Sequence, residues 1–464
     1  MEKGAVVSGM HDPVPNKWWT DGKLALLCVV VGIAAGLSAV VFRWSIHFFH
    51  GIMWDYFGTF LTRFGDWTIV FVPIVGMVSV WGFLRLALRK GEGHGITEVM
   101  RLMTLRDGRI SAHIAPVECI ASSLCIGAGG SVGPEGPMIQ IGSGIGSFIG
   151  QIFKLERRKL VLITAAGAAG GLGAIFNAPI AGVIFAMEAV LEEFNSKGFC
   201  FLVISSVVAT QVNKAIVGNR VLLDMNGAVW GQWPELIVFA LMGILGGIIG
   251  VSFIWFLEKT SALFASINAM PGILKPIIGG TILGLFALYF PVVLGEGYEY
   301  MDMAINLKFS MGMFFLIVFV KIFSTSMTLG TGGSGGVFAP SLLMGTMFGG
   351  GFFLLTSSVF PNIVGSPETY IAVGMAAILG SAFKAPMTAI IMIMEITNNY
   401  TIVLPVMIAA VCGTFMSWVF LKGCSIYNIK LIKDGTREVE TDFWVPRTHL
   451  SSVKDESVQD EVSL

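Results

Sequence analysis

Residues 129–137 read GGSVGPEGP, a glycine-rich turn that leads into an apolar run from Met138 to Phe153. Such a run can only be a helix in apolar surroundings, and Glu135 stands where that helix begins. A helix start presents unpaired N–H groups and the positive end of the helix dipole, so it binds anions. We expect this site to hold either the Glu135 carboxylate or a diffusible anion that displaces it. The alternative is a buried, neutral Glu135 that only supports packing.

The composition is that of a polytopic membrane protein. Of the 464 residues, 55% are hydrophobic and 13% are charged, with a mean hydropathy of +0.79. Soluble proteins carry about 25% charged residues. The net charge of -1 argues against a nucleic-acid partner. The six cysteines show no metal-binding spacing, and we expect no metal and no cofactor.

Long apolar runs alternate with interrupted ones. A spanning helix needs about 20 apolar residues, and the runs at residues 115–127 and 138–153 are too short or are cut by glycine and proline. These interruptions predict broken helices that line a cavity or lie buried in protein. The longer apolar runs are Leu24–Phe49, Trp67–Ala87, Leu160–Val190, Phe199–Val217, Leu236–Phe256, Ile277–Val293, Met311–Phe323, Val337–Phe360, Tyr370–Ile396 and Ile402–Leu421.

The two halves of the chain repeat each other. FNAP at residues 176–179 is followed by Glu188, and FKAP at residues 383–386 is followed by Glu395, each 207 residues after its counterpart. Both glutamates can be structural hydrogen-bonding acids at equivalent helix ends. Repeats with interrupted helices at matching positions predict a site near the membrane midplane, between the halves.

This repeat divides the chain into four expected parts. They are an N-terminal cytoplasmic segment (residues 1–20), a first membrane repeat (residues 21–225), a second, inverted membrane repeat (residues 226–430) and a short polar cytoplasmic tail (residues 431–464).

A third turn, GHGIT at residues 93–97, also precedes a helix. Three helix starts, near residues 94, 135 and 337, can converge on one point without a buried cation. Amides and hydroxyls carry only partial charges, so they bind an anion weakly enough for it to leave again.

These turns resemble the CLC family of chloride channels and chloride/proton antiporters, in its prokaryotic type without CBS domains. The marks of that family are a GSGIP turn, a GREGP turn with the gating glutamate, a GxFxP turn and a late tyrosine. Here they read Gly93–Thr97, Gly133–Pro137, Gly336–Pro340 and Tyr427. The resemblance implies an all-α integral membrane protein with the CLC-type inverted-repeat fold and many broken and tilted helices. It also implies a homodimer with one pore in each subunit.

The resemblance makes Glu135 the gate. It assigns anion binding to His94, Gly95, Ile96, Gly136, Val337, Phe338, Ala339 and Tyr427. His94 stands where the family usually has a serine, and the same turn ends in Thr97 in place of proline. The imidazole can donate an N–H to the anion and respond to pH near neutrality, or it can point away and leave binding to the amides.

The proton route departs from the family pattern at Ala189, where antiporter members have a second glutamate. The family's channels also lack this acid, although some exchangers manage without it. We therefore predict channel-like conduction, of the voltage-gated chloride channel type, for chloride or a similar small monovalent anion. The alternative is a proton-coupled chloride antiporter with a non-standard proton route, in which Glu135, Glu188 and Glu192 are the candidate proton pathway.

An enzyme is not expected. The segment GGSGG at residues 332–336 matches the GxSxG pattern of serine hydrolases, and an intramembrane serine protease is the remote alternative. The only histidine after Ser334 is His449, in the polar tail. The short loops and missing appended modules predict a multi-pass protein in the lipid bilayer of a prokaryotic inner membrane.

Overall fold

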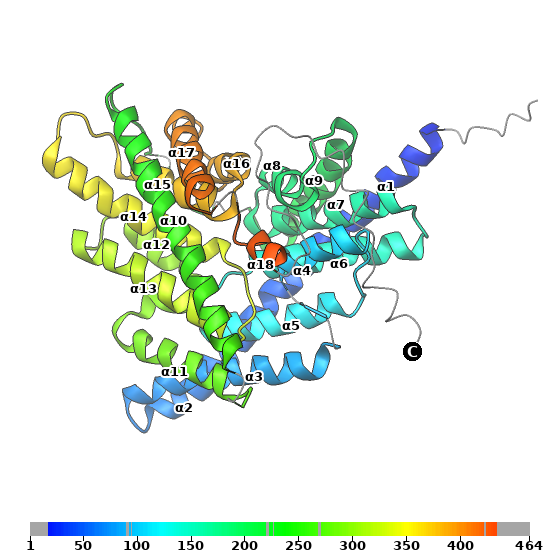
Figure 1. Ribbon diagram of the computed structural model, residues 1–464, viewed down its shortest axis with the longest axis horizontal. Coiled ribbons are helices and arrows are strands. Elements are labelled where there is room, and N and C mark those ends of the chain that lie inside the picture. Colours follow the sequence, from blue (N-terminus) through cyan, green and yellow to red (C-terminus); the bar gives the residue numbers. More distant parts are fainter. Residues whose placement is uncertain are drawn as a thin grey trace, which may run out of the picture.

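The computed structural model describes residues 17–89, 92–93, 95–219, 222–225, 227–267, 271–421 and 424–433 (Figure 1). Every regular element within these residues is a helix. The one β-type pairing among them is an isolated antiparallel bridge between Gly133 and Gly336. The all-α fold class predicted from the sequence is confirmed.

Eight helical segments of the described chain are long and apolar enough to cross a membrane. The chain is a multi-pass integral membrane protein. These segments contain α1 (Lys17–His50), α3 (Phe71–Ala87), α7 (Arg157–Phe176), α9 (Ser196–Val217), α10 (Glu235–Ser266), α13 (Met311–Gly330), α14 (Phe338–Val359) and α17 (Val403–Leu421).

Shorter helices fill the space between the long ones. They are η1 (Gly51–Gly58), α2 (Thr59–Thr62), η2 (Asp66–Val70), α4 (Ile96–Leu105), α5 (Ile114–Gly127), α6 (Glu135–Ile152), α8 (Pro179–Phe185), η3 (Ala186–Leu191), α11 (Leu274–Tyr289), η4 (Pro291–Val293), α12 (Tyr298–Ile305), α15 (Pro367–Phe383), α16 (Pro386–Thr397) and α18 (Asn428–Lys433).

Two of the longer apolar runs are interrupted and do not form single continuous helices. The run Leu160–Val190 breaks at Asn177, and the run Tyr370–Ile396 breaks at Lys384. Both residues adopt left-handed backbone conformations, with φ of 59° and 54°. In each case an Ala-Pro pair follows. The residue before a proline disfavours helical geometry, and proline is favoured in a first helical turn. The helix therefore ends and restarts there.

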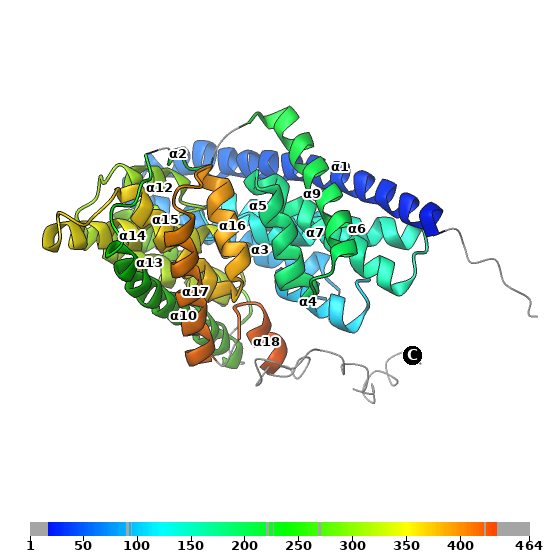
Figure 2. The ribbon, with the colours of Figure 1, turned by 90° about the horizontal axis from the view of Figure 1, so that it is seen from above.

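The two halves pack their helices in the same pattern. In the first half α6 lies along α7, α7 along α9 and α1 along α9. In the second half α14 lies along α15, α15 along α17 and α10 along α17. Viewed from above, α1 runs along one edge of the molecule and α17 lies on the opposite side (Figure 2).

Glycines bring the backbones of the innermost helix pairs into direct contact. A methyl group on Gly167 of α7 would lie 2.0 Å from the carbonyl oxygen of Gly142 on α6. A methyl group on Gly374 of α15 would lie 2.3 Å from the carbonyl oxygen of Gly345 on α14. Small residues permit this close packing in membranes. The contacts fix α6 and α14, whose first turns belong to the site described below.

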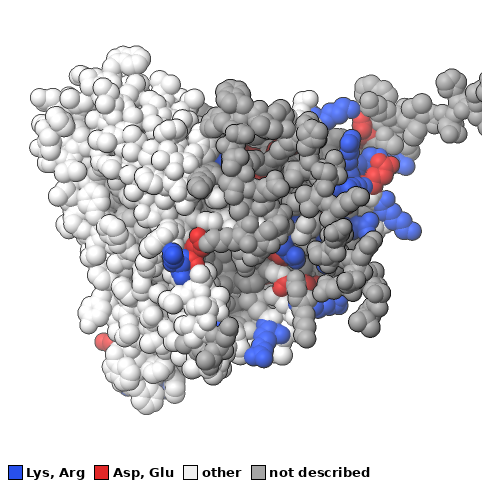
Figure 3. All heavy atoms as spheres, viewed as in Figure 1, with Lys and Arg blue, Asp and Glu red and all other residues white. Residues whose placement is uncertain are grey.

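The surface is that of a protein surrounded by lipid. The part of the face in Figure 3 that lies over α10–α15 shows very few charged side chains, and Lys and Arg gather at the opposite edge. Large apolar side chains are exposed on the outer helices, such as Trp44 on α1 and Phe415 on α17. In water such an extended apolar surface is a liability, whereas hydrocarbon accommodates it.

Candidate functional site

The starts of α4, α6 and α14 meet near the middle of the molecule. Gly133, before α6, and Gly336, before α14, exchange two backbone hydrogen bonds with N···O distances of 2.8 and 2.6 Å. The amide of Gly95, at the start of α4, donates a hydrogen bond to the Gln140 side chain on α6. The three turns predicted from the sequence are therefore brought together, and each contributes first-turn N–H groups that have no partner within their own helix.

The Glu135 carboxylate lies among these helix starts and is fully buried. Its Oε1 accepts a hydrogen bond of 2.8 Å from the Tyr298 hydroxyl. Its Oε2 accepts a long hydrogen bond of 3.4 Å from the Ala339 amide in the first turn of α14. A side chain from the first half is thus held at the helix start of the second half. An anion is stabilised there by the amides and by the helix dipole.

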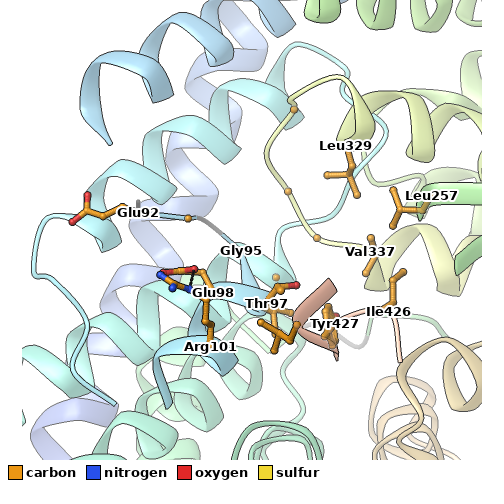
Figure 4. Close-up of a pocket in the computed structure, with 17 residues that line it drawn as sticks. Glu92, Gly95, Thr97, Glu98, Arg101, Leu257, Leu329, Val337, Ile426 and Tyr427 are labelled. Atoms are coloured by element: carbon orange, nitrogen blue, oxygen red, sulfur yellow. Dashed lines mark hydrogen bonds and ion pairs between the residues drawn. The ribbon is translucent and has the colours of Figure 1, made fainter. Parts of the chain in front are cut away.

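A cavity of about 570 Å³ approaches this point from one side (Figure 4). Five of the predicted anion-binding residues line it. They are Gly95, Ile96, Gly136, Val337 and Tyr427. The cavity reaches Gly136, the residue directly after the buried Glu135. The cavity therefore brings solvent-sized space next to the residue that follows Glu135.

Phe338 and Ala339, the other two described anion-binding candidates, are not among the residues that line the cavity. The Phe338 ring stacks on Phe383 with 4.0 Å between ring centroids, and Tyr427 stacks on the same Phe383 ring at 5.3 Å. The edge contacts of Phe185 with Phe338 and Tyr427 complete the group. These aromatic contacts fix Tyr427 against the start of α14.

The Tyr427 hydroxyl is buried and has no hydrogen-bond partner in the part of the chain that the structure describes. Buried hydroxyls without partners are rare because they lose their hydration and gain nothing in return. An anion in the adjoining cavity is a suitable acceptor for this hydroxyl. The orphaned donor is therefore an observation in favour of an anion site.

A profile of the family described as "Voltage gated chloride channel" matches residues 75–417. The chain belongs to the CLC family. The predicted resemblance to the family is confirmed.

Two curated relatives match most of the chain. The "H(+)/Cl(-) exchange transporter ClcA" of Vibrio cholerae serotype O1 (strain M66-2) is 31% identical over 446 residues, covering 92% of this chain and 93% of the relative. The protein of the same name from Yersinia pestis bv. Antiqua (strain Angola) is 29% identical over 427 residues, covering 88% and 87%. These relatives favour the antiporter alternative, and they do not support the channel-like main prediction.

Solved CLC structures share the fold. The structure of a slow cyanobacterial Cl-/H+ antiporter superposes with a TM-score of 0.81 at 23% identity, covering 90% of this chain and 99% of its own. The structure of a CLC-type fluoride/proton antiporter gives a TM-score of 0.75 at 21% identity, covering 88% and 98%.

Glu188, a candidate for the proton pathway, caps a helix of the other half of this CLC chain. It accepts hydrogen bonds from the amides of Met387 (3.1 Å) and Thr388 (2.7 Å), at the start of α16. The repeat-equivalent Glu395 accepts from two amides at the start of α8, with distances of 3.0 and 2.6 Å. The reciprocal contacts agree with the interpretation of both acids as structural hydrogen-bonding groups.

The other positions of the predicted proton route are in or next to η3. Ala189 is buried in η3 and carries no proton-binding group. Glu192 directly follows η3, and its left-handed backbone (φ 53°) ends that helix. His94 lies outside the described residues, so the choice between its two predicted roles stays a prediction.

Glu92, at the mouth of the cavity, pairs with His113, whose Nε2 lies 2.8 Å from Glu92 Oε2. The Arg89 amide donates to the same oxygen at 3.0 Å. Burial raises the pKa of the Glu92 carboxyl, but the hydrogen bonds from Arg89 and His113 outweigh it and bring the pKa below its usual value.

Ser334, which suggested a hydrolase, is a buried turn residue. Its hydroxyl lies 2.8 Å from the Ser122 hydroxyl and donates a 3.1 Å hydrogen bond to Glu118. A serine nucleophile needs a general base and access to its substrate, whereas this fully buried hydroxyl is committed to two neighbours. Among the described residues no group of three His, Cys, Asp or Glu side chains forms a metal site.

Sequence reasoning missed Tyr298, because nothing in the segment GEGYEY marks it as a partner of a glutamate 163 residues away. It also passed over Lys321, although an ionisable residue in an apolar run is a functional candidate. Lys321 is fully buried, and its Nζ donates to backbone carbonyls including that of Gly295 (3.0 Å). The lysine supports the loop that leads to Tyr298.

Proposed function

We propose that this CLC protein exchanges chloride for protons across the membrane, with Glu135 as the gate shared by both ions. The observation that carries the proposal is the position of the Glu135 carboxylate. It lies at the first turn of α14, where an anion is stabilised, and Gly136, the next residue of the chain, lines a cavity large enough for hydrated ions. A carboxylate in this position can be displaced by chloride, or it can leave the site when it is protonated.

The antiport reaction is supported by the two relatives, which are named as exchange transporters, and by the structural similarity to the cyanobacterial antiporter. Chloride is favoured over fluoride because the relatives with the higher identity are named as chloride exchangers. Channel-like conduction is the second candidate function. The observation that favours it is Ala189, which leaves the position of the usual inner acid without a proton carrier.

The inner proton route belongs to the same proposal. Glu188 is engaged at the start of α16, so its charge stabilises that helix. Glu192 is the remaining acid of the predicted route, and a loss of proton movement in Glu192→Gln with chloride flux retained would assign it. His94 is proposed as an additional donor to the anion.

Further parts of the proposal rest on family membership. We propose a homodimer with one complete pathway per subunit, built from two inverted repeats at residues 21–225 and 226–430. The protein acts as a transporter in a prokaryotic inner membrane and performs no enzymatic reaction. The reciprocal capping by Glu188 and Glu395 supports the inverted repeats.

The test uses the purified full-length protein in liposomes with an imposed chloride gradient and a clamped voltage. Antiport predicts uphill proton movement driven by chloride, and Glu135→Gln should abolish proton movement while chloride still moves. Chloride flux without proton movement in the unsubstituted protein would establish the channel-like alternative. If no small anion moved and Glu135→Gln changed nothing, the proposed function would be wrong.

A further inference from the structure

Tyr298 is the first residue of α12, and its position is fixed by the turn before it. Gly297 has a left-handed backbone with φ of 86°, which glycine adopts without strain. A methyl group on Gly297 would lie 2.7 Å from the Leu343 side chain on α14. Because α12 is packed against α14, the Tyr298 ring has a defined place relative to the first turn of α14.

Tyr298 and that first turn together hold the gate. The Tyr298 hydroxyl binds Glu135 Oε1 at 2.8 Å, and the Ala339 amide approaches Oε2 at 3.4 Å. The shorter of the two contacts therefore comes from the tyrosine. A hydrogen bond to an ionised acceptor is roughly twice as strong as one to a neutral acceptor, so the hydroxyl favours the charged carboxylate over the protonated acid in this position.

A second carboxyl group, that of Glu296, acts on this contact. Glu296 lies in the same loop as Tyr298 and interacts electrostatically with Glu135. Arg43 of α1 and Lys321 of α13 are the cations that act on Glu296. An ionised Glu296 would repel the Glu135 carboxylate and favour its departure, whereas the tyrosine hydroxyl favours its retention.

We propose that Tyr298 is a positioning residue of the gate. Its hydroxyl holds the ionised Glu135 carboxylate in the anion site and sets how readily chloride displaces it. The inference rests on the proposed function, in which Glu135 and chloride compete for one site. Nothing in the chemistry requires Tyr298 to contact the transported anion.

The test compares Tyr298→Phe with the control variant Tyr300→Phe. Tyr300 is a half-buried tyrosine two residues further along α12. Each substitution removes a single hydroxyl oxygen. Chloride binding is measured by isothermal titration on the purified full-length protein, and the ratio of chloride to proton movement is measured in liposomes. Gel filtration and thermal unfolding establish that each variant is folded.

Tyr298→Phe should bind chloride about tenfold more tightly. The Glu135 carboxylate competes with chloride for the site, and in this variant it has lost one charge-assisted hydrogen bond. It should also move more chloride per proton. Tyr300→Phe should match the unsubstituted protein, and Tyr298→Phe should add nothing in a Glu135→Gln background.

Two results would overturn the proposal. In the first, Tyr298→Phe leaves affinity and coupling unchanged while Glu135→Gln alters both, so that only the role of Tyr298 is wrong. In the second, Tyr298→Phe has the same effect with and without the Glu135 carboxylate, so that it acts by another route. If Glu135→Gln itself leaves binding and coupling unchanged, the proposed function fails together with the inference.

Discussion

Gly133→Ala should expel the gate from the anion site without removing any gate residue. Gly133 faces the Glu135 carboxylate, and an added methyl carbon would lie 2.1 Å from Oε2 and 2.8 Å from the Ala339 side chain. The backbone hydrogen bonds between Gly133 and Gly336 use groups that alanine also has. The φ of Gly133 is not in the left-handed region. The perturbation is therefore steric and is directed at the carboxylate.

The size of the effect follows from these distances. Side-chain carbons essentially never approach another heavy atom within 3.0 Å, so Oε2 must retreat by about 0.9 Å or more. A retreat of this size breaks the 3.4 Å contact with Ala339 and strains the 2.8 Å hydrogen bond from Tyr298. Losing one hydrogen bond to a charged group costs about 1.5–3 kcal/mol, which corresponds to roughly a 10- to 150-fold shift from the closed to the open gate.

The assay is the same pair of measurements, chloride binding by titration and coupled flux in liposomes. Gly133→Ala should bind chloride more tightly and lose most of its proton movement, the same loss of proton movement that we expect for Glu135→Gln. Gly82→Ala is the matched control, because a methyl group on Gly82 in α3 meets nothing within 4 Å. A folded Gly133→Ala protein with normal affinity and normal coupling would refute the reasoning, since the carboxylate could not then rest where the structure has it.

Three further predictions concern the surroundings of the gate. Tyr427→Phe should weaken chloride binding by about tenfold, measured by titration, because it removes the orphaned hydroxyl beside the cavity. Glu188→Gln should lower the melting temperature and keep proton coupling, because the charge caps α16; lost coupling at an unchanged melting temperature would contradict this. Since the pKa of Glu92 is lowered, its contact with His113 should persist at neutral pH and weaken as the pH falls through that lowered value. The measurement is amide hydrogen exchange at the start of α5, corrected for the intrinsic pH dependence of exchange. Exchange there should become faster as the contact between Glu92 and His113 weakens.

Much of the site could be predicted because its groups follow local rules. Glycine and proline mark a helix start wherever they stand in an apolar run, and a carboxylate at that start is conspicuous in a membrane segment. The turns at Gly95, Gly136 and Val337 were found in this way. Their convergence followed from the repeat, since equivalent segments of two inverted halves meet at the midplane.

The parts that escaped prediction depend on contacts between distant residues or on the backbone around single positions. The breaks at Asn177 and Lys384 lie inside continuous apolar runs, and hydropathy alone does not separate one long span from two shorter helices. The Ala-Pro pairs carried the signal for both breaks. The contact between Tyr298 and Glu135 has no signal in the sequence, because its geometry depends on how α12 packs on α14.

The arrangement explains how an anion site can be both selective and weak. A full cation beside the site would bind chloride tightly and would also pair permanently with Glu135. The buried Lys321 is instead directed to the backbone carbonyls of Val293 and Gly295. From the second half the carboxylate is held by a hydroxyl and an amide, those of Tyr298 and Ala339. A shift of α12 or α14 relative to α6 by even about 1 Å would therefore release Glu135, because hydrogen bonds to it weaken steeply with distance.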